Sequence, residues 1–159
     1  MHQYHYCLDS NFFIESWNIH YSPEVFIDFW DKLKDMAENK ICYITQEVFE
    51  ELVSGDNKKE DLLKEYIKNN KKIFVYEYNE EIEIIFIELI KDTDIVKLLD
   101  NKNNKNGADV LILAYAKYFD STVVTRDSAL INICKKYNIR YLLPHKFIKE
   151  NNIKFIIQK

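Results

Sequence analysis

The stretch from Gly107 to Asp127, GADVLILAYAKYFDSTVVTRD, constrains the fold more than any other part of the chain. The segment Val110 to Ala116 is apolar on every side of the helix that it predicts, and such a helix must be buried. A strand-like STVV follows, and acids bracket the two elements, Asp109 and Asp127. An unpaired carboxylate is costly to bury, so these acids are expected either to cap helices or to take part in chemistry.

Short apolar runs alternate with helical patterns along most of the chain. Strands that alternate with helices imply a parallel sheet with helices on both faces, so the predicted fold class is α/β. The strands are expected at Tyr4–Leu8, Ile41–Ile44, Thr122–Thr125 and Ile139–Leu142.

Several residues mark where helices are expected to begin or end. Ser22 followed by Pro23 is typical of a helix start, and Thr45 is expected to cap a helix that ends near Gly55. Pro144 is expected to begin a short helix. Four segments complete the prediction: a mostly helical region over Lys58–Leu99, a strand or extended connector within it at Ile73–Tyr76, a polar loop at Asn101–Asn106 and an edge strand at Phe155–Ile157.

Length and composition indicate one compact domain over residues 1–159, since 47% of the residues are hydrophobic. The net charge of −4 argues against a protein that coats DNA through its overall field. Three widely spaced cysteines, Cys7, Cys42 and Cys134, fit reduced core thiols better than a disulfide framework. There is no leader pattern and no apolar run of the ~20 residues that span a bilayer, so a cytoplasmic protein without membrane contact is expected.

Open α/β sheets bind ligands beyond the carboxyl ends of their strands, and three acids of this chain fall at or near such ends while a fourth begins the helix after the polar loop. Asp9 and Asp127 follow predicted strands, Glu51 lies on the helix after the second strand, and Asp109 begins the apolar helix. Four carboxylates at one edge would repel one another and need a cation to stay ionised. Oxygen ligands without histidine or cysteine at ligand spacing suit Mg²⁺ or Mn²⁺, and one or two such ions suit phosphodiester hydrolysis.

Four segments of the chain, CLDSNFFIE, VFEELVSG, GADVLILAYAK and TVVTRD, resemble the acidic motifs of PIN-domain ribonucleases, in particular the small bacterial toxins of toxin–antitoxin pairs. They occur in the order of that family, and the resemblance spans nearly the whole chain. It implies a Rossmann-like α/β/α sandwich with a mostly parallel central sheet, the PIN-like fold. It also implies an endoribonuclease dependent on Mg²⁺ or Mn²⁺, in which a metal-activated water hydrolyses RNA and leaves a 5′-phosphate and a 3′-hydroxyl.

The resemblance assigns roles to individual residues. The metal ligands and catalytic acids would be, in order, Asp9, Glu51, Asp109 and Asp127; Ser10 and Asn11 would orient ligands or phosphate, and Thr125 would support Asp127. Glu50 competes with Glu51, because both lie about equally far from the apolar stripe of their helix; Glu51 is preferred because the family's acid directly precedes a leucine, here Leu52.

Other interpretations stay open at this point. Taken singly, Asp127 is a typical helix N-cap, and Asp109 suits the first turn of a helix. The alternatives to a ribonuclease are an inactive PIN-like module that binds RNA or protein, a structure-specific DNA nuclease and, less well matched, an aspartate-phosphorylated receiver or phosphatase. The resemblance implies RNA as substrate, a cognate antitoxin as partner and a homodimer. Because the net charge is negative, RNA would need local lysines, of which the candidates are Lys58, Lys59, Lys71, Lys72, Lys102, Lys105, Lys135 and Lys136.

Overall fold

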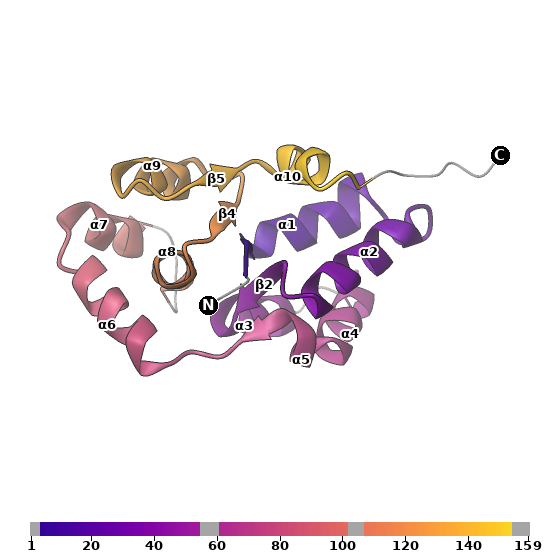
Figure 1. Cartoon of the computed structure of the whole chain (residues 1–159), viewed down its shortest axis with the longest axis horizontal. Helices are drawn as coiled ribbons and strands as arrows, with labels where there is room; N and C mark the ends of the chain where they lie inside the picture. Colours follow the sequence, from indigo (N-terminus) through magenta and orange to yellow (C-terminus); the bar gives the residue numbers. More distant parts are fainter. Residues whose placement is uncertain (1–3, 55–60, 102–106, 154–159) are drawn as a thin grey trace.

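A five-stranded, wholly parallel sheet forms the centre of the computed structural model, which describes residues 4–54, 61–101 and 107–153 (Figure 1). The strands follow one another across the sheet in the order β3-β2-β1-β4-β5. The chain first adds strands on one side of β1 and then returns to add β4 and β5 on its other side, so the order reverses between β1 and β4. The strand bounds are β1 Tyr6–Leu8, β2 Cys42–Thr45, β3 Val75–Tyr76, β4 Thr122–Val124 and β5 Tyr141–Leu142.

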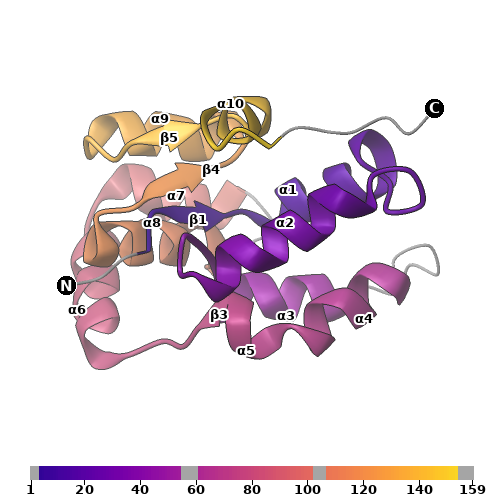
Figure 2. The same ribbon diagram turned by 45° about the vertical axis from the view of Figure 1, so that its right-hand side comes forward.

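Helices cover both faces of this sheet, which confirms the α/β/α architecture and the mostly parallel sheet expected from the sequence (Figure 2). Helix α8 packs across β1, β2 and β4. The helix bounds are α1 Ser10–Glu15, π-helix η1 Ser16–His20, α2 Ile27–Glu38, α3 Gln46–Ser54, α4 Asp61–Asn69, α5 Lys71–Phe74, α6 Glu80–Leu89, α7 Thr93–Asn101, α8 Ala108–Phe119, α9 Ser128–Lys136 and α10 Pro144–Glu150.

The alternation of side chains along the strands divides the core into two aromatic clusters. On one face Tyr43 lies against Tyr115 and Phe119 of α8, with ring centroids 6.2 and 5.2 Å away. On the other face Tyr6 contacts Phe147 of α10 at 5.0 Å. Each strand of the centre is therefore buried on both sides, which explains why these strands read as continuous apolar runs rather than as alternating ones.

Helix α8 is buried along almost its whole length, as its all-round apolar sequence predicts. It begins after Gly107, whose φ of 62° is a left-handed conformation that side chains rarely adopt. A Cβ on Gly107 would also lie 3.4 Å from Leu99 of α7, so glycine lets the chain turn tightly into the helix. The first turn of α8, which includes Asp109, is thereby held against the core.

The structure corrects the predicted start of α2. Ser22 and Pro23 form a turn rather than a helix start, since the Ser22 carbonyl accepts hydrogen bonds from the Val25 and Phe26 N–H groups. The helix begins later, at Ile27. The sequence did not predict α1 and η1, which directly follow Asp9.

Other local predictions hold to within a few residues. The Thr45 hydroxyl caps α3 by accepting from the Val48 N–H at 3.1 Å, and Pro144 begins α10. The segment at Ile73–Tyr76 divides between the end of α5 and strand β3. All three cysteines are buried and unbridged, as expected. Among the described residues no helix has both the length and the apolar character needed to cross a membrane.

Some predictions lie outside the described residues. Asn101 is the last residue of α7, and the rest of the predicted polar loop falls in the undescribed segment 102–106. The same holds for Gly55, for the edge strand at Phe155–Ile157 and for four of the candidate lysines, Lys58, Lys59, Lys102 and Lys105.

Candidate functional site

The carboxyl ends of β1 and β4 are joined through Asp9, the first residue after β1. Its backbone N–H donates to the Val124 carbonyl at 3.2 Å, and the Thr125 hydroxyl donates to its Oδ2 at 2.8 Å. This point lies where the strand order reverses, which is where ligands bind in open α/β sheets. The topology therefore places Asp9 at the position in the sheet best suited to a ligand.

Asp9 is a buried carboxyl group in an acidic environment. Only 5% of the residue is exposed, and burial is the main reason that its pKa rises from 3.8 to about 6. The negative charges of Asp109 and Glu51 raise the pKa further, whereas hydrogen bonds from Thr125 and the Ser10 backbone lower it. Three carboxylates from α3, α8 and the end of β1 therefore act on one another at this edge.

Glu51 faces this group of acids and Glu50 does not. The residue is exposed as a whole, yet loss of hydration raises the pKa of its carboxyl group, and the Asp109 charge raises it further. A hydrogen bond with the Ser10 side chain acts in the opposite direction. The Glu50 carboxylate accepts instead from Gln46 on its own helix, at 3.4 Å. The geometry thus distinguishes two acids that the sequence pattern left equivalent.

Asp127 caps α9 and is also linked to Asp9. Its Oδ1 accepts from the N–H groups of Ala129 at 2.9 Å and Leu130 at 3.2 Å, as the capping interpretation predicts. Its own N–H donates to the Thr125 hydroxyl at 3.1 Å, and that hydroxyl donates in turn to Asp9. One threonine therefore connects the two aspartates, and Thr125 contacts Asp9 as well as Asp127.

The two polar residues after Asp9 differ in their surroundings. Ser10 is buried, and its hydroxyl lies 3.4 Å from Asp9 Oδ1 as well as beside Glu51. Asn11 is exposed on the first turn of α1. Ser10 is thus part of the acidic group itself, whereas Asn11 faces solvent at its border.

The donor atoms at this edge suit a hard divalent cation, because they are carboxylate and hydroxyl oxygens. Within the described ranges, however, no three His, Cys, Asp or Glu side chains form a ready-made ion cage. The acids are close enough to raise one another's pKa, yet they are not arranged as a closed coordination shell. The set fits Mg²⁺ or Mn²⁺ in its chemistry, and an ion would have to draw the acids closer together.

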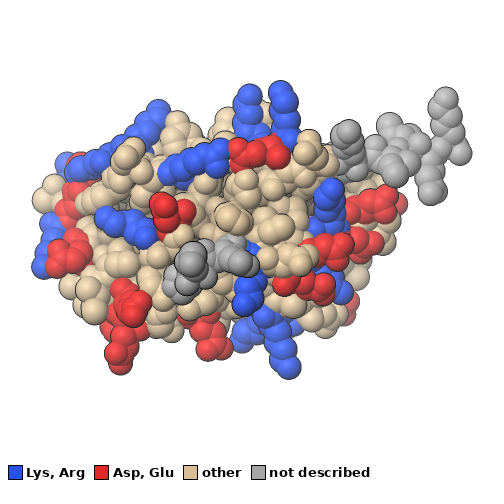
Figure 3. Space-filling view, viewed as in Figure 1, with Lys and Arg blue, Asp and Glu red and all other residues tan. Residues whose placement is uncertain are grey.

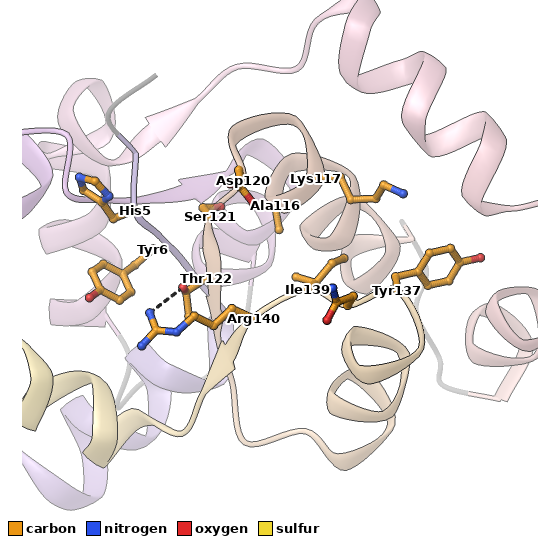
Figure 4. A pocket seen from close by; sticks show the side chains of 11 residues that line it. His5, Tyr6, Ala116, Lys117, Asp120, Ser121, Thr122, Tyr137, Ile139 and Arg140 are labelled. Atoms are coloured by element: carbon orange, nitrogen blue, oxygen red, sulfur yellow. Dashed lines mark hydrogen bonds between the residues drawn. The ribbon is translucent and has the colours of Figure 1, made fainter. Parts of the chain in front are cut away.

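A pocket of about 570 Å³ lies at the edge of the sheet opposite to the acids, at the amino ends of β1 and β4 (Figure 4). Arg140 borders it and donates to the Thr122 hydroxyl at 3.1 Å. The pocket is also lined by Asp120 and Tyr137, which end α8 and α9, and helix C-termini disfavour anions. Despite its volume, this pocket contains none of the acids of the candidate site.

Basic side chains do not gather into one patch on the face shown in Figure 3, where they alternate with acidic ones. Three of the four described candidate lysines make contacts within the fold. Lys71 lies over the Phe49 ring, Lys135 over the Tyr141 ring, and Lys136 bridges Asp92 and Asp94. Sequence reasoning overlooked a different cation, Arg126, which stands between Thr125 and Asp127 in the TVVTRD motif and forms an ion pair with Glu15 at 3.6 Å.

Comparisons with solved structures identify the fold of this chain. VapBC2 from Rickettsia felis bound to a DNA fragment from their promoter matches with a TM-score of 0.56 at 20% identity, over 87% of this chain and 97% of that one. FitAB bound to the IR36 DNA fragment matches with the same score and identity, over 87% and 94%. FitAcB from Neisseria gonorrhoeae matches with a TM-score of 0.53 at 19% identity, over 88% and 98%. The chain has the PIN-like fold that its motifs predicted.

The particular family follows from the sequence. A family model described as "Domain of unknown function (DUF4411)" matches residues 6–155, and the chain belongs to this family. No curated protein matches the sequence.

Proposed function

We propose that this protein is a divalent-metal-dependent endoribonuclease, and that it is the toxin of a toxin–antitoxin pair. One observation is central to the proposal: the buried carboxyl group of Asp9 lies at the sheet's switch point, with its pKa raised to about 6 and the charges of Asp109 and Glu51 acting on it. Mutually repelling carboxylates are unfavourable for folding, and a bound cation would turn them into ligands. The PIN-like fold and the order of the acidic motifs support the same chemistry.

In this proposal Asp9, Glu51, Asp109 and Asp127 hold one or two Mg²⁺ or Mn²⁺ ions. Such an ion lowers the pKa of a water nucleophile and stabilises charge on the attacked phosphate. The protein's own part is to keep the acids in place. Thr125 orients Asp9 and Asp127 through one hydroxyl, and α8 holds Asp109 against the core.

Ser10 and Asn11 have the remaining roles in the proposed site. The Ser10 hydroxyl lies between Asp9 and Glu51, so it would keep the two carboxylates in position to share a ligand. Asn11 is exposed at the border of the acids, where its amide can donate to a phosphate oxygen of the RNA.

The antitoxin is expected to cover exposed apolar surface. Three largely exposed side chains lie in η1, in the turn that follows it and at the first residue of α2: Ile19 is exposed by 71%, Val25 by 74% and Ile27 by 61%. Exposed apolar groups of this kind are candidates for protein contacts. A homodimer in the cytoplasm belongs to the proposal through the resemblance to PIN-domain toxins.

The decisive experiment replaces Asp109 by Asn and measures cleavage of a labelled RNA with Mn²⁺. Removing one ligand charge costs several kcal/mol of transition-state stabilisation, so the rate should fall by at least about 100-fold. Asp120→Asn is the matched control, because Asp120 ends the same helix beside the other pocket and its left-handed φ of 53° tolerates asparagine. The circular dichroism spectra of both variants should match that of the wild type.

Retained cleavage by a folded Asp109→Asn variant would overturn the mechanism. Calorimetric titration with Mn²⁺ separates the nuclease from an inactive binding module, since a module whose acids only cap helices would bind no ion at millimolar concentration. Parallel assays with RNA and DNA of the same sequence would separate a ribonuclease from a structure-specific DNA nuclease.

The toxin role has its own test, which is expression of the chain alone in a bacterial host. Growth should stop on induction of the wild type and continue on induction of Asp109→Asn. Co-expression of a small open reading frame adjacent to the gene should restore growth. Continued growth with the wild type would remove the toxin role and leave the nuclease proposal standing.

A further inference from the structure

A second, smaller cavity lies beside the acids, on the same edge of the sheet. It has a volume of about 170 Å³ and lies between the end of α1, η1, the connection from β4 to α9 and the start of α10. Figure 1 shows α1 and α10 side by side, and the rings of Phe12 and Phe147 join them at 5.6 Å. The side chains that matter for its chemistry are Phe12, Glu15, His20, Tyr21, Arg126 and His145.

The cavity is connected to the candidate site through the backbone on two sides. Arg126 lies directly between Thr125 and Asp127, and the Thr125 hydroxyl accepts from the Asp127 N–H and donates to Asp9. Glu15 is on the helix that begins right after Asp9, five residues beyond Ser10, which is roughly 8 Å at 1.5 Å per residue. A polynucleotide with one phosphate at the acids would therefore pass close to this cavity.

The walls of the cavity suit a planar ring. Tyr21 is half-buried and the imidazoles of His20 and His145 are exposed at its border, whereas Phe12 belongs to the core. Tyr21 is held rigidly because its ring stacks on Phe29 at 4.9 Å. Proteins that read single-stranded RNA stack unpaired bases on such rings. The volume is below the ~300–1,000 Å³ of pockets for drug-sized ligands, so it suits a single group such as one base.

The polar groups of the cavity discriminate between ligands. Arg126 Nη1 and Glu15 Oε2 are 3.6 Å apart, which is an ion pair but too long for a hydrogen bond, so the donors and acceptors can still bond a ligand. A carboxylate in the cavity disfavours a phosphate there. Guanine offers two acceptors, O6 and N7, which an arginine fork binds in pairs, and an edge with two N–H donors that a carboxylate accepts. No other base matches both groups in this way.

We propose that this cavity binds one guanine base of the RNA next to the cleaved phosphate, with Arg126 donating to O6 and N7 and Glu15 accepting from N1–H and the 2-amino group. This rests on the proposed ribonuclease function and names the base that the site selects. Arg126 and Glu15 are then specificity residues of the enzyme, and the rings of Tyr21, His20 and His145 hold the base by stacking.

The test uses short RNAs that are identical except at one nucleoside, which is guanosine, adenosine, inosine or 7-deazaguanosine. Inosine lacks the amino group that Glu15 accepts from, and 7-deazaguanine lacks the N7 that Arg126 binds. Each change should lower kcat/KM of the wild type by roughly 5- to 150-fold, the range for one well-formed base contact. The Glu15→Ala variant should cleave the guanine and inosine RNAs equally, and Arg126→Ala should no longer distinguish guanine from 7-deazaguanine.

Arg140→Ala is the matched control, because it removes an arginine fork at the other pocket and should retain the full guanine preference. Equal cleavage of all four RNAs by the wild type would overturn the proposal while leaving the nuclease in place. Binding is measured separately by calorimetry with GMP and AMP on the Asp109→Asn variant, which does not need cleavage. If no RNA is cleaved, the proposed function fails, and tighter binding of GMP than of AMP still decides the nature of the cavity.

Discussion

Two groups of acids in this molecule behave in opposite ways. At the β1 edge, burial and the charges of Asp109 and Glu51 raise the pKa of Asp9 to about 6. Between α7 and α9, the Lys136 ammonium lies 2.7 Å from Asp92 and 2.8 Å from Asp94. The hydrogen bonds that Lys136 and the Tyr137 hydroxyl donate to Asp92 lower the pKa of Asp92 to about 2. The acids of the second group are neutralised by Lys136, and these ion pairs link α7 to α9. Asp9 is surrounded by like charge, which is typical of a site that binds an external cation.

The largest effect that tests this contrast is expected at Asp9. Its pKa is higher in the folded chain than in the unfolded one, so the folded state binds more protons and the free energy of unfolding falls as the pH rises from about 4 to about 6. A rise from 3.8 to about 6 corresponds to roughly 3 kcal/mol. Urea unfolding at pH 4 and pH 7 should show this loss in the wild type and not in Asp9→Asn.

A divalent ion adds a second arm to the same experiment. Mn²⁺ at pH 7 should restore part of the stability of the wild type, by about 2.7 kcal/mol at a hundred times its dissociation constant, and should leave Asp9→Asn unchanged. If the wild type and Asp9→Asn lose equal stability between pH 4 and pH 7, the pKa of the Asp9 carboxyl group is not raised in the folded chain.

A smaller effect is expected from the pair of glutamates on α3. Glu51→Gln removes a proposed metal ligand whose charge also acts on Asp9, so RNA cleavage should fall by about 100-fold. Glu50→Gln is the ideal control, because it changes the adjacent residue, whose carboxylate contacts Gln46 instead. Initial rates for both variants at saturating Mn²⁺ decide the matter. Equal losses of cleavage rate in the two variants would show that the side of α3 on which a glutamate lies does not decide its role in the site.

The smallest effect is expected at the compensated acids. Lys136→Ala should leave RNA cleavage at the wild-type rate, because its partners are exposed or lie away from β1. A depressed pKa stabilises the fold above pH 4 and loses this effect as the pH falls toward about 2. The acid-unfolding curves of variant and wild type should therefore differ above pH 4 and converge near pH 2. A loss of cleavage in this variant would contradict the claim that the acids paired with Lys136 take no part in the reaction.

Much of the fold could be predicted because its strands and its central helix are buried on all sides. A residue such as Tyr43, or any in the run Val110 to Ala116, is buried whichever side of its element it occupies. The apolar pattern of these segments therefore identifies them without knowledge of how the elements pack. The start of α2 was predicted wrongly because Ser22 and Pro23 satisfy the rules for a helix cap and also those for a turn. Helix α1 lacked a recognisable start, since its N-cap Asp9 makes no capping hydrogen bond through its side chain.

The sequence alone determined the alternation of elements, the buried character of α8 and the candidate acids at and after strand ends, because these depend on residue type and on local spacing. Only the tertiary structure decided which acids meet. Glu50 and Glu51 are equivalent on an isolated helix, and they differ once Ser10 and Asp109 stand on one side of it. The cavity of Glu15 and Arg126 likewise joins residues more than a hundred positions apart, and only the pairing of β1 with β4 brings them together.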